Sequence, residues 1–141
     1  AVDVVRSVQQ RSQLRFFLEQ LDQVKRGCRL DALMPILGRL GQALNVRAMM
    51  TVNDEGRISL VGPARGRRGG IKRLVQDAAA RSPMEMLGVG HIRCPDEAHE
   101  IADELAALLA MPRAEIFVLD IGSVLIAHAG AGTLGVATVA R

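Results

Sequence analysis

Apolar and polar side chains alternate in several short stretches of this chain, as they do in strands that have one buried face. The alternation is clean from Val46 to Val52, and it resumes at Ile58 and Leu60. Residues 53–56 lie between these stretches and contain the Asn, Asp and Gly that turns favour, so a β-hairpin is expected. The same alternation predicts further strands at residues 14–18, 84–92, 116–118 and 134–139.

In other stretches the apolar residues recur every three or four positions, which is the spacing of one helix face. This spacing predicts helices over residues 21–24, 37–44, 71–78 and 96–109, with a helix end at residues 2–10 and a short helix or turn from Ser123. Gly27 would end the first of these helices, and Pro112 would end the last. Helices therefore alternate with strands along the chain.

Interleaved strands and helices with one hairpin predict a two-layer α/β sandwich. We expect a mixed, largely antiparallel sheet with the helices mainly on one face. A length of 141 residues suits a single domain spanning residues 1–141. Leu37, Leu105 and Val118 are expected to be buried, because each lies on one of the predicted apolar stripes.

The composition limits which chemistries the chain can carry. Aromatic residues make up only 2% of the sequence, so stacking of nucleic-acid bases on aromatic rings has almost no support. The formal net charge of +3 is compatible with an acidic partner without requiring one. We find no nucleophile with an activating base in the sequence, and therefore no candidate catalytic residue.

Two features of the sequence bear on location. Cys28 and Cys94 do not make a disulfide framework, and reduced thiols in the cytoplasm are the simpler interpretation. No apolar run is long enough to cross a membrane, and no signal peptide opens the sequence, so membrane insertion is not expected.

The sequence begins at Ala1 inside a predicted helix, which suggests a fragment or a processed product.

A basic stretch follows the predicted hairpin. Residues 62–70 are expected to form a polar loop that carries Arg65, Arg67 and Arg68 among four glycines, and Lys72 and Arg73 extend the basic cluster onto the helix that follows. One interpretation is a solvated loop and helix face. The other is a docking surface for an anionic partner, such as an acidic protein surface, a phosphate or nucleic acid. Without aromatic residues or a recognition-helix motif, nucleic acid is the least favoured of these partners.

Two further patterns resemble binding motifs, one for a dinucleotide and one for zinc, but the surrounding sequence supports neither site. Residues 130–135 match the dinucleotide fingerprint G-x-G-x-x-G, but no helix and second strand can follow in the six remaining residues. The glycines at 130 and 132 instead suit a tight turn in which the backbone passes close to a neighbouring group. His91, Cys94 and His99 offer three ligands for zinc without a convincing fourth, so ordinary structural roles are favoured and no metal is expected.

Arg29 and His128 are the candidates for polar ligand contacts. Arg29 lies in a loop between two apolar segments, where it could cap a helix end or hold a carboxylate through two hydrogen bonds. His128 lies in a glycine-flanked loop. For each residue, a structural role and a ligand role are equally compatible with the sequence.

A set of motifs, taken in order, resembles the C-terminal domain of the DegV family. Residues 24–30 resemble its Lys-Lys-Gly-Gly-Arg loop, and residues 44–48 resemble its Asn-Ile-Lys-Pro strand entry. Residues 63–67 resemble its Val-Arg-Gly loop, and residues 121–132 resemble its Ile-Gly-Pro-Val-Ile-Gly-x-His-x-Gly-Pro-Gly segment. The order holds from about residue 12 to the end. Cys28, Ile126 and Ala131 depart from the family pattern, which affects the ligand geometry more than the fold.

The resemblance implies a protein of two domains that holds a long-chain fatty acid and presents its carboxylate to a separate fatty acid kinase. The N-terminal domain, which supplies the hydroxyl groups of the family's carboxylate site, would then be absent from this chain. By motif, Arg29 and His128 would lie near the head group, with close backbone approach at Gly130 and Gly132. The acyl-tunnel candidates are Leu37, Leu40 and Met49, and the partner-docking candidates are Arg65, Arg67 and Arg68. No cofactor is implied beyond the bound fatty acid.

Three classes of function are therefore compared. The chain is expected to be a lipid carrier without catalytic residues of its own. The first alternative is a basic binding module for an acidic protein or for nucleic acid, which a steep salt dependence of binding would reveal. The second is an enzyme domain whose catalytic half is missing, which turnover by this chain alone would reveal.

Overall fold

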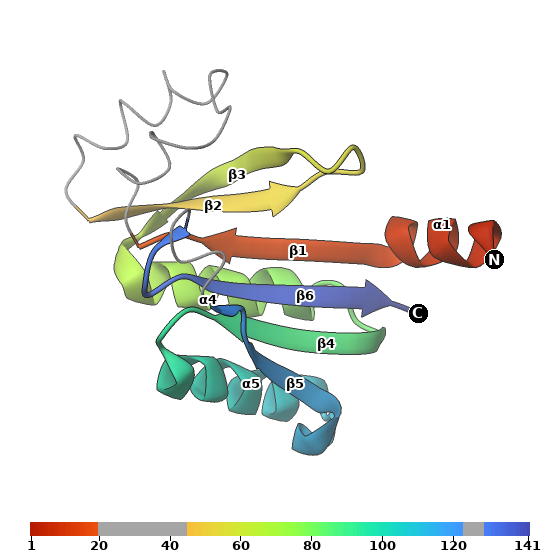
Figure 1. Cartoon of the computed structure of the whole chain (residues 1–141). Helices are drawn as coiled ribbons and strands as arrows, with labels where there is room; N and C mark the ends of the chain where they lie inside the picture. Colours follow the sequence, from red (N-terminus) through yellow and green to blue (C-terminus); the bar gives the residue numbers. More distant parts are fainter. Residues whose placement is uncertain (20–44, 123–128) are drawn as a thin grey trace.

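The computed structural model describes residues 1–19, 45–122 and 129–141, and Figure 1 shows their arrangement. Helices and strands alternate through these residues. In chain order the elements are α1 (Val2–Arg11), β1 (Ser12–Phe17), β2 (Val46–Val52), β3 (Ile58–Arg65), α4 (Gly66–Ala79), β4 (Met84–His91), α5 (Pro95–Leu109), η1 (Arg113–Glu115), β5 (Ile116–Asp120) and β6 (Leu134–Ala140).

The strands form one six-stranded sheet in the order β3-β2-β1-β6-β4-β5. All neighbouring strands are antiparallel except β4 and β5, which run parallel. The β2–β3 pair is the predicted hairpin, and the side chain of Asn53 accepts hydrogen bonds from the backbone of Glu55 and Arg57 in its turn. Central β1 pairs with both β2 and β6, so it ties the hairpin to the C-terminal strands.

Helices α4 and α5 cover one face of the sheet (Figure 1). The main core lies between them and the strands, where Phe17, Leu74, Leu105 and Leu134 are fully buried. Burial of a side chain of this size contributes roughly 1.5–3 kcal/mol relative to leaving it in water. Helix α1 differs from the other two, because none of its residues is buried and it extends past the strands.

The opposite face of the sheet carries no helix among the described residues. A small second cluster lies there, in which Leu18 and Met50 are buried against Phe16 and Leu60. Towards β5 the same face is open, and Phe117 remains 52% exposed. Exposed apolar side chains lie on several strands of this face, among them Leu14 on β1, Met86 on β4 and Phe117 on β5.

The predicted fold class is confirmed: this is a mixed α/β fold with a mixed, largely antiparallel sheet and two helices packed on one face. Leu105 is buried as expected, and Val118 is partly buried against the main core. The third residue of that prediction, Leu37, lies outside the described residues, as do the predicted helices between residues 20 and 44 and the turn from Ser123.

The prediction of a loop over residues 62–70 is wrong. The first four of these residues complete β3, where Pro63 pairs with Ala48 on an edge strand that can accept a proline. The remaining residues begin α4 at Gly66, and one of the glycines that suggested a loop is used in packing. At Gly70 a Cβ atom would lie 3.0 Å from the ring of Phe17, so glycine lets the helix sit close to the sheet.

Candidate functional site

The two ends of the sheet differ in character. At one end, on the left of Figure 1, strands β1, β4 and β5 end while β2 and β6 begin. The pairing shows this: Leu134 at the start of β6 pairs with Phe17 and His91, the last residues of β1 and β4. His91 pairs in turn with Asp120, the last residue of β5. Helices α4 and α5 also begin there, so their N-terminal turns face the same group of loops. We refer to it as the Arg67 end, because the side chain of Arg67 connects most of the segments that meet there.

Arg67 makes hydrogen bonds to acceptors from three separate segments. Its Nε and Nη2 atoms donate to the two carboxylate oxygens of Glu97, both at 2.7 Å. Its Nη1 atom donates to Glu19 Oε2 at 2.5 Å and to the carbonyl oxygen of Gly132 at 2.8 Å. The guanidinium also lies over the ring of Phe17, 5.7 Å from its centroid. One side chain thus links α4 to the end of β1, the start of α5 and the turn before β6.

Glu19 is shared between two arginines. While its Oε2 atom accepts from Arg67, its Oε1 atom accepts from Arg47 Nη2 at 2.8 Å. Only 17% of the Arg47 side chain and 25% of the Arg67 side chain are exposed, so these bonds are partly shielded from water. Charge-assisted hydrogen bonds are stronger in such surroundings than on an open surface.

The charges at this end of the sheet shift one another's ionisation. Hydrogen bonds donated by Arg67 hold the pKa of Glu97 below its ordinary value, so this carboxylate is ionised at neutral pH. The same hydrogen bonds raise the pKa of Arg67 above its ordinary value, although burial acts in the opposite direction. Burial raises the pKa of the Cys94 thiol, which makes it a poor nucleophile at neutral pH.

The turn that leads into β6 is held by several hydrogen bonds. Thr133 Oγ1 donates to the carbonyl oxygens of Ala129 and Gly130, at 2.8 and 3.0 Å. The amide of Gly132 donates to Ile92, and the amide of Ile92 donates to Thr133, so the turn is also fixed to the end of β4. Gly130 and Gly132 have φ values of +79° and +92°, a region that favours glycine.

The backbone does pass close to other groups at Gly132. A Cβ atom built there would lie 3.1 Å from Glu19 Cβ and 3.4 Å from Arg67 Nη1. The groups that approach this glycine in the structure are therefore protein side chains. A ligand role for Gly130 and Gly132 stays a prediction.

The three arginines of the predicted docking surface differ in their surroundings. Arg65 and Arg68 are exposed, as expected. Arg67 is not, because its donors are occupied by Glu19, Glu97 and Gly132, and the expectation that it faces solvent is wrong. The basic stretch is therefore divided between two exposed cations and one that is part of the structure.

The remaining candidate residues fall into two groups. Arg29, Leu37, Leu40 and His128 lie outside the described residues. Met49 is fully buried in the main core on the helix-covered face, whereas its neighbour Met50 points to the second cluster on the other face. A part for Met49 in an acyl tunnel stays a prediction.

The described neighbours of the two predicted head-group residues lie at the Arg67 end of the sheet. Glu19 and Asn45 flank residues 20–44, which include Arg29. Gly122 and Ala129 flank residues 123–128, which include His128. Both segments therefore attach at the end of the sheet where the arginines and carboxylates gather.

The three residues that suggested zinc are not brought together as a metal site. His91 is buried in the sheet, while His99 is exposed on α5 and contacts Arg113. The Cys94 thiol donates to the carbonyl oxygen of Thr133 at 3.5 Å. Within the described parts of the chain, no group of three or more His, Cys, Asp or Glu residues could hold a metal ion.

Sequence patterns did not identify Glu19, Arg47 or the pairing of Arg67 with Glu97. Glu97 lies in the first turn of the helix predicted over residues 96–109, where the local pattern shows no partner for it. Its partner is thirty positions away, and the partner Glu19 is forty-eight positions from Arg67. No periodicity links residues at such distances, so the pairing becomes visible only when α4, α5 and β1 are packed together.

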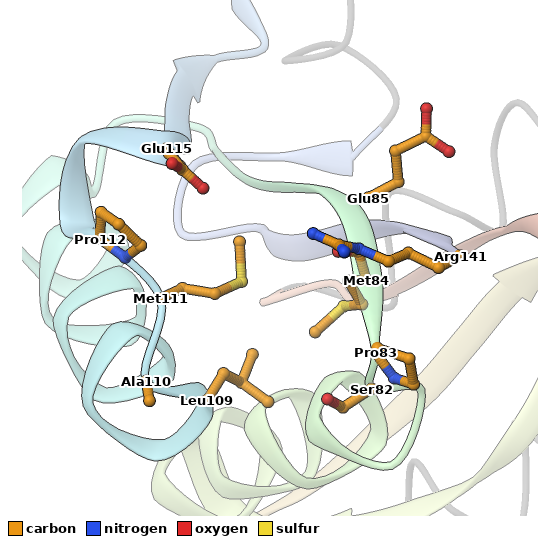
Figure 2. Close-up of a pocket in the computed structure, with 10 residues that line it drawn as sticks. All are labelled: Ser82, Pro83, Met84, Glu85, Leu109, Ala110, Met111, Pro112, Glu115 and Arg141. Atoms are coloured by element: carbon orange, nitrogen blue, oxygen red, sulfur yellow. The ribbon is translucent and has the colours of Figure 1, made fainter.

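A hollow of about 270 Å³ lies at the opposite end of the sheet, between the end of α5 and the start of β4. Figure 2 shows Met84, Leu109 and Met111 pointing towards one another across it, with Glu85 and Arg141 on one side. Arg141 Nε donates to the carbonyl oxygen of Met84. Because this hollow is separated from the Arg67 end by the length of the strands, it is not part of the candidate site.

No helix within residues 1–19, 45–122 and 129–141 is both long and apolar enough to span a membrane.

A family model described as "Uncharacterised protein, DegV family" matches residues 1–141. A DegV domain-containing protein of Clostridium perfringens is 32% identical over 124 residues, which cover 86% of this chain and 41% of that protein. A DegV domain-containing protein of Streptomyces coelicolor is 33% identical over 129 residues, covering 89% of this chain and 44% of that protein. The chain thus spans less than half the length of these curated relatives.

Solved structures share this fold. A fatty acid binding DegV family protein of Streptococcus agalactiae superposes with a TM-score of 0.80 at 21% identity, covering 99% of this chain and 48% of that one. The Fatty Acid Kinase (Fak) B3 protein of Streptococcus pneumoniae, loaded with linoleic acid, gives a TM-score of 0.82 at 17% identity, with coverage of 99% and 48%. At these identities the likeness concerns the fold.

Proposed function

This chain belongs to the DegV family, and from that membership we propose that it binds a long-chain fatty acid as part of a carrier. The observation that carries the proposal is the family match over all 141 residues. The solved proteins of the same fold from Streptococcus agalactiae and Streptococcus pneumoniae are described as fatty acid binding and as loaded with linoleic acid, which supports the assignment.

The physical character of the domain supports an amphiphilic ligand. A fatty acid needs hydrogen-bond donors for its carboxylate and an apolar surface for its chain. The described donors of Arg47 and Arg67 bind protein acceptors, so the donors for a carboxylate would come from Arg29 and His128, and the helix-free face beside the Arg67 end carries apolar side chains. Phe16, Leu18, Met50 and Leu60 form a cluster on that face, at the last residues of β1. A head group at the Arg67 end would therefore have apolar side chains beside it.

Arg29 and His128 are the proposed head-group residues. Arg29 would donate charge-assisted hydrogen bonds to the carboxylate, and His128 would orient it. The described residues on either side of both segments lie at the Arg67 end, which supports their approach. Gly130 and Gly132 would bring the backbone of the β6 turn close to the ligand, while Leu37, Leu40 and Met49 would line the acyl tunnel.

We further propose that the chain acts with other proteins. The curated relatives are more than twice as long, so a second domain would complete the carboxylate site. A separate fatty acid kinase would then act on the bound carboxylate, so the domain would bind and present the ligand without catalysing a reaction itself. This work would take place in the cytoplasm, and it calls for no cofactor other than the fatty acid.

Arg65 and Arg68 are the proposed docking residues for an acidic surface of such a partner. Both are exposed beside the Arg67 end of the sheet, so a protein bound there would be close to the head group. The competing function, a basic module for nucleic acid, rests on the same two cations. Binding to an oligonucleotide with a steep salt dependence, in the absence of fatty-acid binding, would favour that alternative.

The test of the proposed function is a direct measurement of fatty-acid binding. The purified chain is titrated with linoleic acid, and lipid carried through purification is identified by mass spectrometry. We expect saturable binding of the acid, and we expect Arg29→Ala and His128→Ala each to weaken it by about tenfold, the effect of one lost charge-assisted contact. Arg73→Ala serves as a matched control, because Arg73 pairs with Asp77 on the side of α4 and has no proposed ligand role.

The results of this titration distinguish the proposed fatty-acid binding from the proposed roles of Arg29 and His128. Absence of both bound lipid and saturable binding would contradict the proposed function of this chain. Binding that is unchanged in both variants would leave a lipid-binding domain but would remove Arg29 and His128 from its head-group site.

A further inference from the structure

We propose that the layer formed by α4 and α5 is an interface between two copies of this chain, in which the basic outer face of α4 pairs with the acidic outer face of α5. The inference goes beyond the proposed function, because it depends on neither the fatty acid nor its head-group residues. It is carried by the charges that the two helices present on the side away from the sheet.

The outer face of α4 is basic. The helix buries Leu74 and Val75 against the sheet, and its opposite side carries Arg68 and Lys72, which are exposed and one turn apart. Arg65, also exposed, comes just before the first turn. The N-terminal end of a helix is the positive end of its dipole, and like charges one turn apart repel, so these cations do not stabilise α4 itself. We call these three cations the basic ladder.

The outer face of α5 is acidic. Ile101 and Leu105 are fully buried beneath this helix. On its other side Asp96, Glu100 and Glu104 are exposed and follow one another at intervals of one turn. No Lys or Arg lies on the same helix to balance them. We call these three carboxylates the acidic ladder.

The two ladders lie side by side on one surface. Helices α4 and α5 pack against one another on the same face of the sheet, and both begin at the Arg67 end (Figure 1). The ion pair between Arg67 and Glu97 joins their first turns, so the ladders are also level along the helix axes. The ion pairs found among the described residues include none of the six ladder charges. Both ladders are therefore available to a partner.

This arrangement is the one that a two-fold dimer requires. A half-turn about an axis between the helices and parallel to them places α4 of one copy over α5 of the other, and the reverse. Because such a rotation does not shift the copies along the axis, the ladders remain level. Arg68 of one copy then falls between Asp96 and Glu100 of the other. Lys72 falls one turn further along, between Glu100 and Glu104.

A second copy satisfies both ladders at once, which a partner of a single charge does not. An acidic partner would pair with α4 and be repelled by α5 beside it, while a basic partner would meet the opposite arrangement. Because Arg65 and Arg68 lie in this interface, the dimer and the proposed acidic partner would exclude each other.

The size of the helix layer implies a weak dimer. Two helices of about 20 Å by 10 Å would bury about 400 Å² on each copy, or about 800 Å² in total. Stable complexes bury roughly 1,200–2,000 Å². An interface that is smaller than this and held mainly by charges is expected to dissociate readily and to be sensitive to salt.

Sedimentation velocity over a range of protein concentrations measures this self-association. We expect a monomer–dimer equilibrium at about 0.01 M salt, where charges act over about 30 Å. At about 1 M salt screening shortens that distance to about 3 Å, and we expect monomer alone. A chain that is monomeric in both conditions would overturn the proposal and leave the ladders to other molecules. A dimer that salt does not weaken would also overturn it.

Reversing one ladder at a time tests which charges meet. Arg68→Glu with Lys72→Glu makes the outer faces of both helices mainly acidic, and Glu100→Lys with Glu104→Lys makes both mainly basic. Each double variant alone should associate at least about tenfold more weakly than wild type, because attractive pairs become repulsive. An equal mixture should form a heterodimer, since the reversed ladders then face each other and so do the unchanged ones.

The matched control is Arg6→Glu with Arg57→Glu, which changes the net charge as much as the reversal on α4 does. Both residues are exposed and lie outside the helix layer, on α1 and in the β2–β3 turn. This control should dimerise as wild type does. Loss of association in the control, or a mixture of the two ladder variants that stays monomeric, would overturn the proposal.

Circular dichroism establishes that each variant is folded at the temperature of the measurement. If a double reversal does not fold, the single reversals Lys72→Glu and Glu100→Lys take its place. The same loss in each variant and the same recovery on mixing are expected, and the proposal falls if either fails to occur.

Discussion

Arg67 and Glu97 form an ion pair whose contribution to the free energy of unfolding depends on pH. Two parallel hydrogen bonds of 2.7 Å join them, and about a third of the Glu97 side chain remains exposed. Water therefore screens the pair in part, and its contribution to stability is expected near the upper end for surface ion pairs, about 1 kcal/mol.

The lowered pKa of Glu97 gives the direction of this pH dependence. A carboxylate whose pKa is lower in the folded state stabilises the fold above its unfolded pKa, about 4.5, and this stability is lost as the pH falls through the folded value. We expect Glu97→Gln to lower the free energy of unfolding at pH 7 by about 1 kcal/mol. The difference from wild type should shrink on acidification below about pH 4.5. Urea denaturation at several pH values measures this, and a difference that grows in acid would contradict the pairing.

At the scale of elements, the two faces of the sheet have different roles. Phe17 on β1 is fully buried against α4, where Gly70 makes room for its ring. Phe117 on β5 belongs to the helix-free face and is 52% exposed. The two residues are chemically identical, so they offer a matched comparison of the faces.

We expect Phe17→Ala to lower the free energy of unfolding by about 3–5 kcal/mol, the usual cost of removing a buried phenylalanine. Phe117→Ala should cost less than about 1 kcal/mol, because water already reaches much of its ring. Urea denaturation of both variants tests this difference. Similar losses at the two positions would mean that the helix-free face is packed as tightly as the core.

The first turn of α4 carries residues with distinct functions. Arg65, just before the helix, and Arg68 are exposed, whereas Arg67 crosslinks three segments. We expect the double variant Arg65→Ala, Arg68→Ala to change the free energy of unfolding by less than about 1 kcal/mol, because exposed charges contribute little. Arg67→Ala should cost clearly more, since it removes both hydrogen bonds to the partly buried carboxylate of Glu97 and one of the two to Glu19. A large loss in the double variant would show that the exposed arginines are structural too.

At the scale of the whole molecule, the polar Arg67 end of the sheet lies next to its apolar helix-free face. Among the described residues, no helix lies between the two. Such a domain suits a ligand that is itself polar at one end and apolar along its length. The chain covers less than half of its curated relatives, so part of the ligand's enclosure would come from the second domain of the proposed carrier.

Binding of a fatty acid to the folded state alone must stabilise it. With free linoleic acid at a hundred times its dissociation constant, the expected gain is about 2.7 kcal/mol, seen as a higher midpoint of thermal unfolding. Linoleyl alcohol at the same concentration should give a smaller shift, because it cannot use the head-group donors. An unchanged or lower midpoint with the acid would argue against a specific site in this chain.

The sequence by itself determined the two-layer architecture and the order and type of the described elements, except for the short helix η1 and the first turn of α4. The alternation from Val46 to Val52 and the apolar helical stripe through Ile101 and Leu105 are local patterns. In each element the spacing of its own apolar residues predicts which face is buried. The ordered motifs also predicted the DegV family, which the comparisons confirm. These predictions succeeded because hydrophobic periodicity and motif order are properties of neighbouring residues.

Only the tertiary structure decided the role of the basic stretch. Its four glycines and its proline suggested a loop, but pairing of β3 with β2 and packing of Gly70 on Phe17 outweighed those local tendencies. The role of Arg67 was also hidden, because its partners Glu19 and Glu97 lie far away in sequence on both sides. An ion pair depends on distance in space, and that distance is set by how β1, α4 and α5 pack. The sequence therefore predicted which charges exist, and the fold determined which of them meet a partner and which face water.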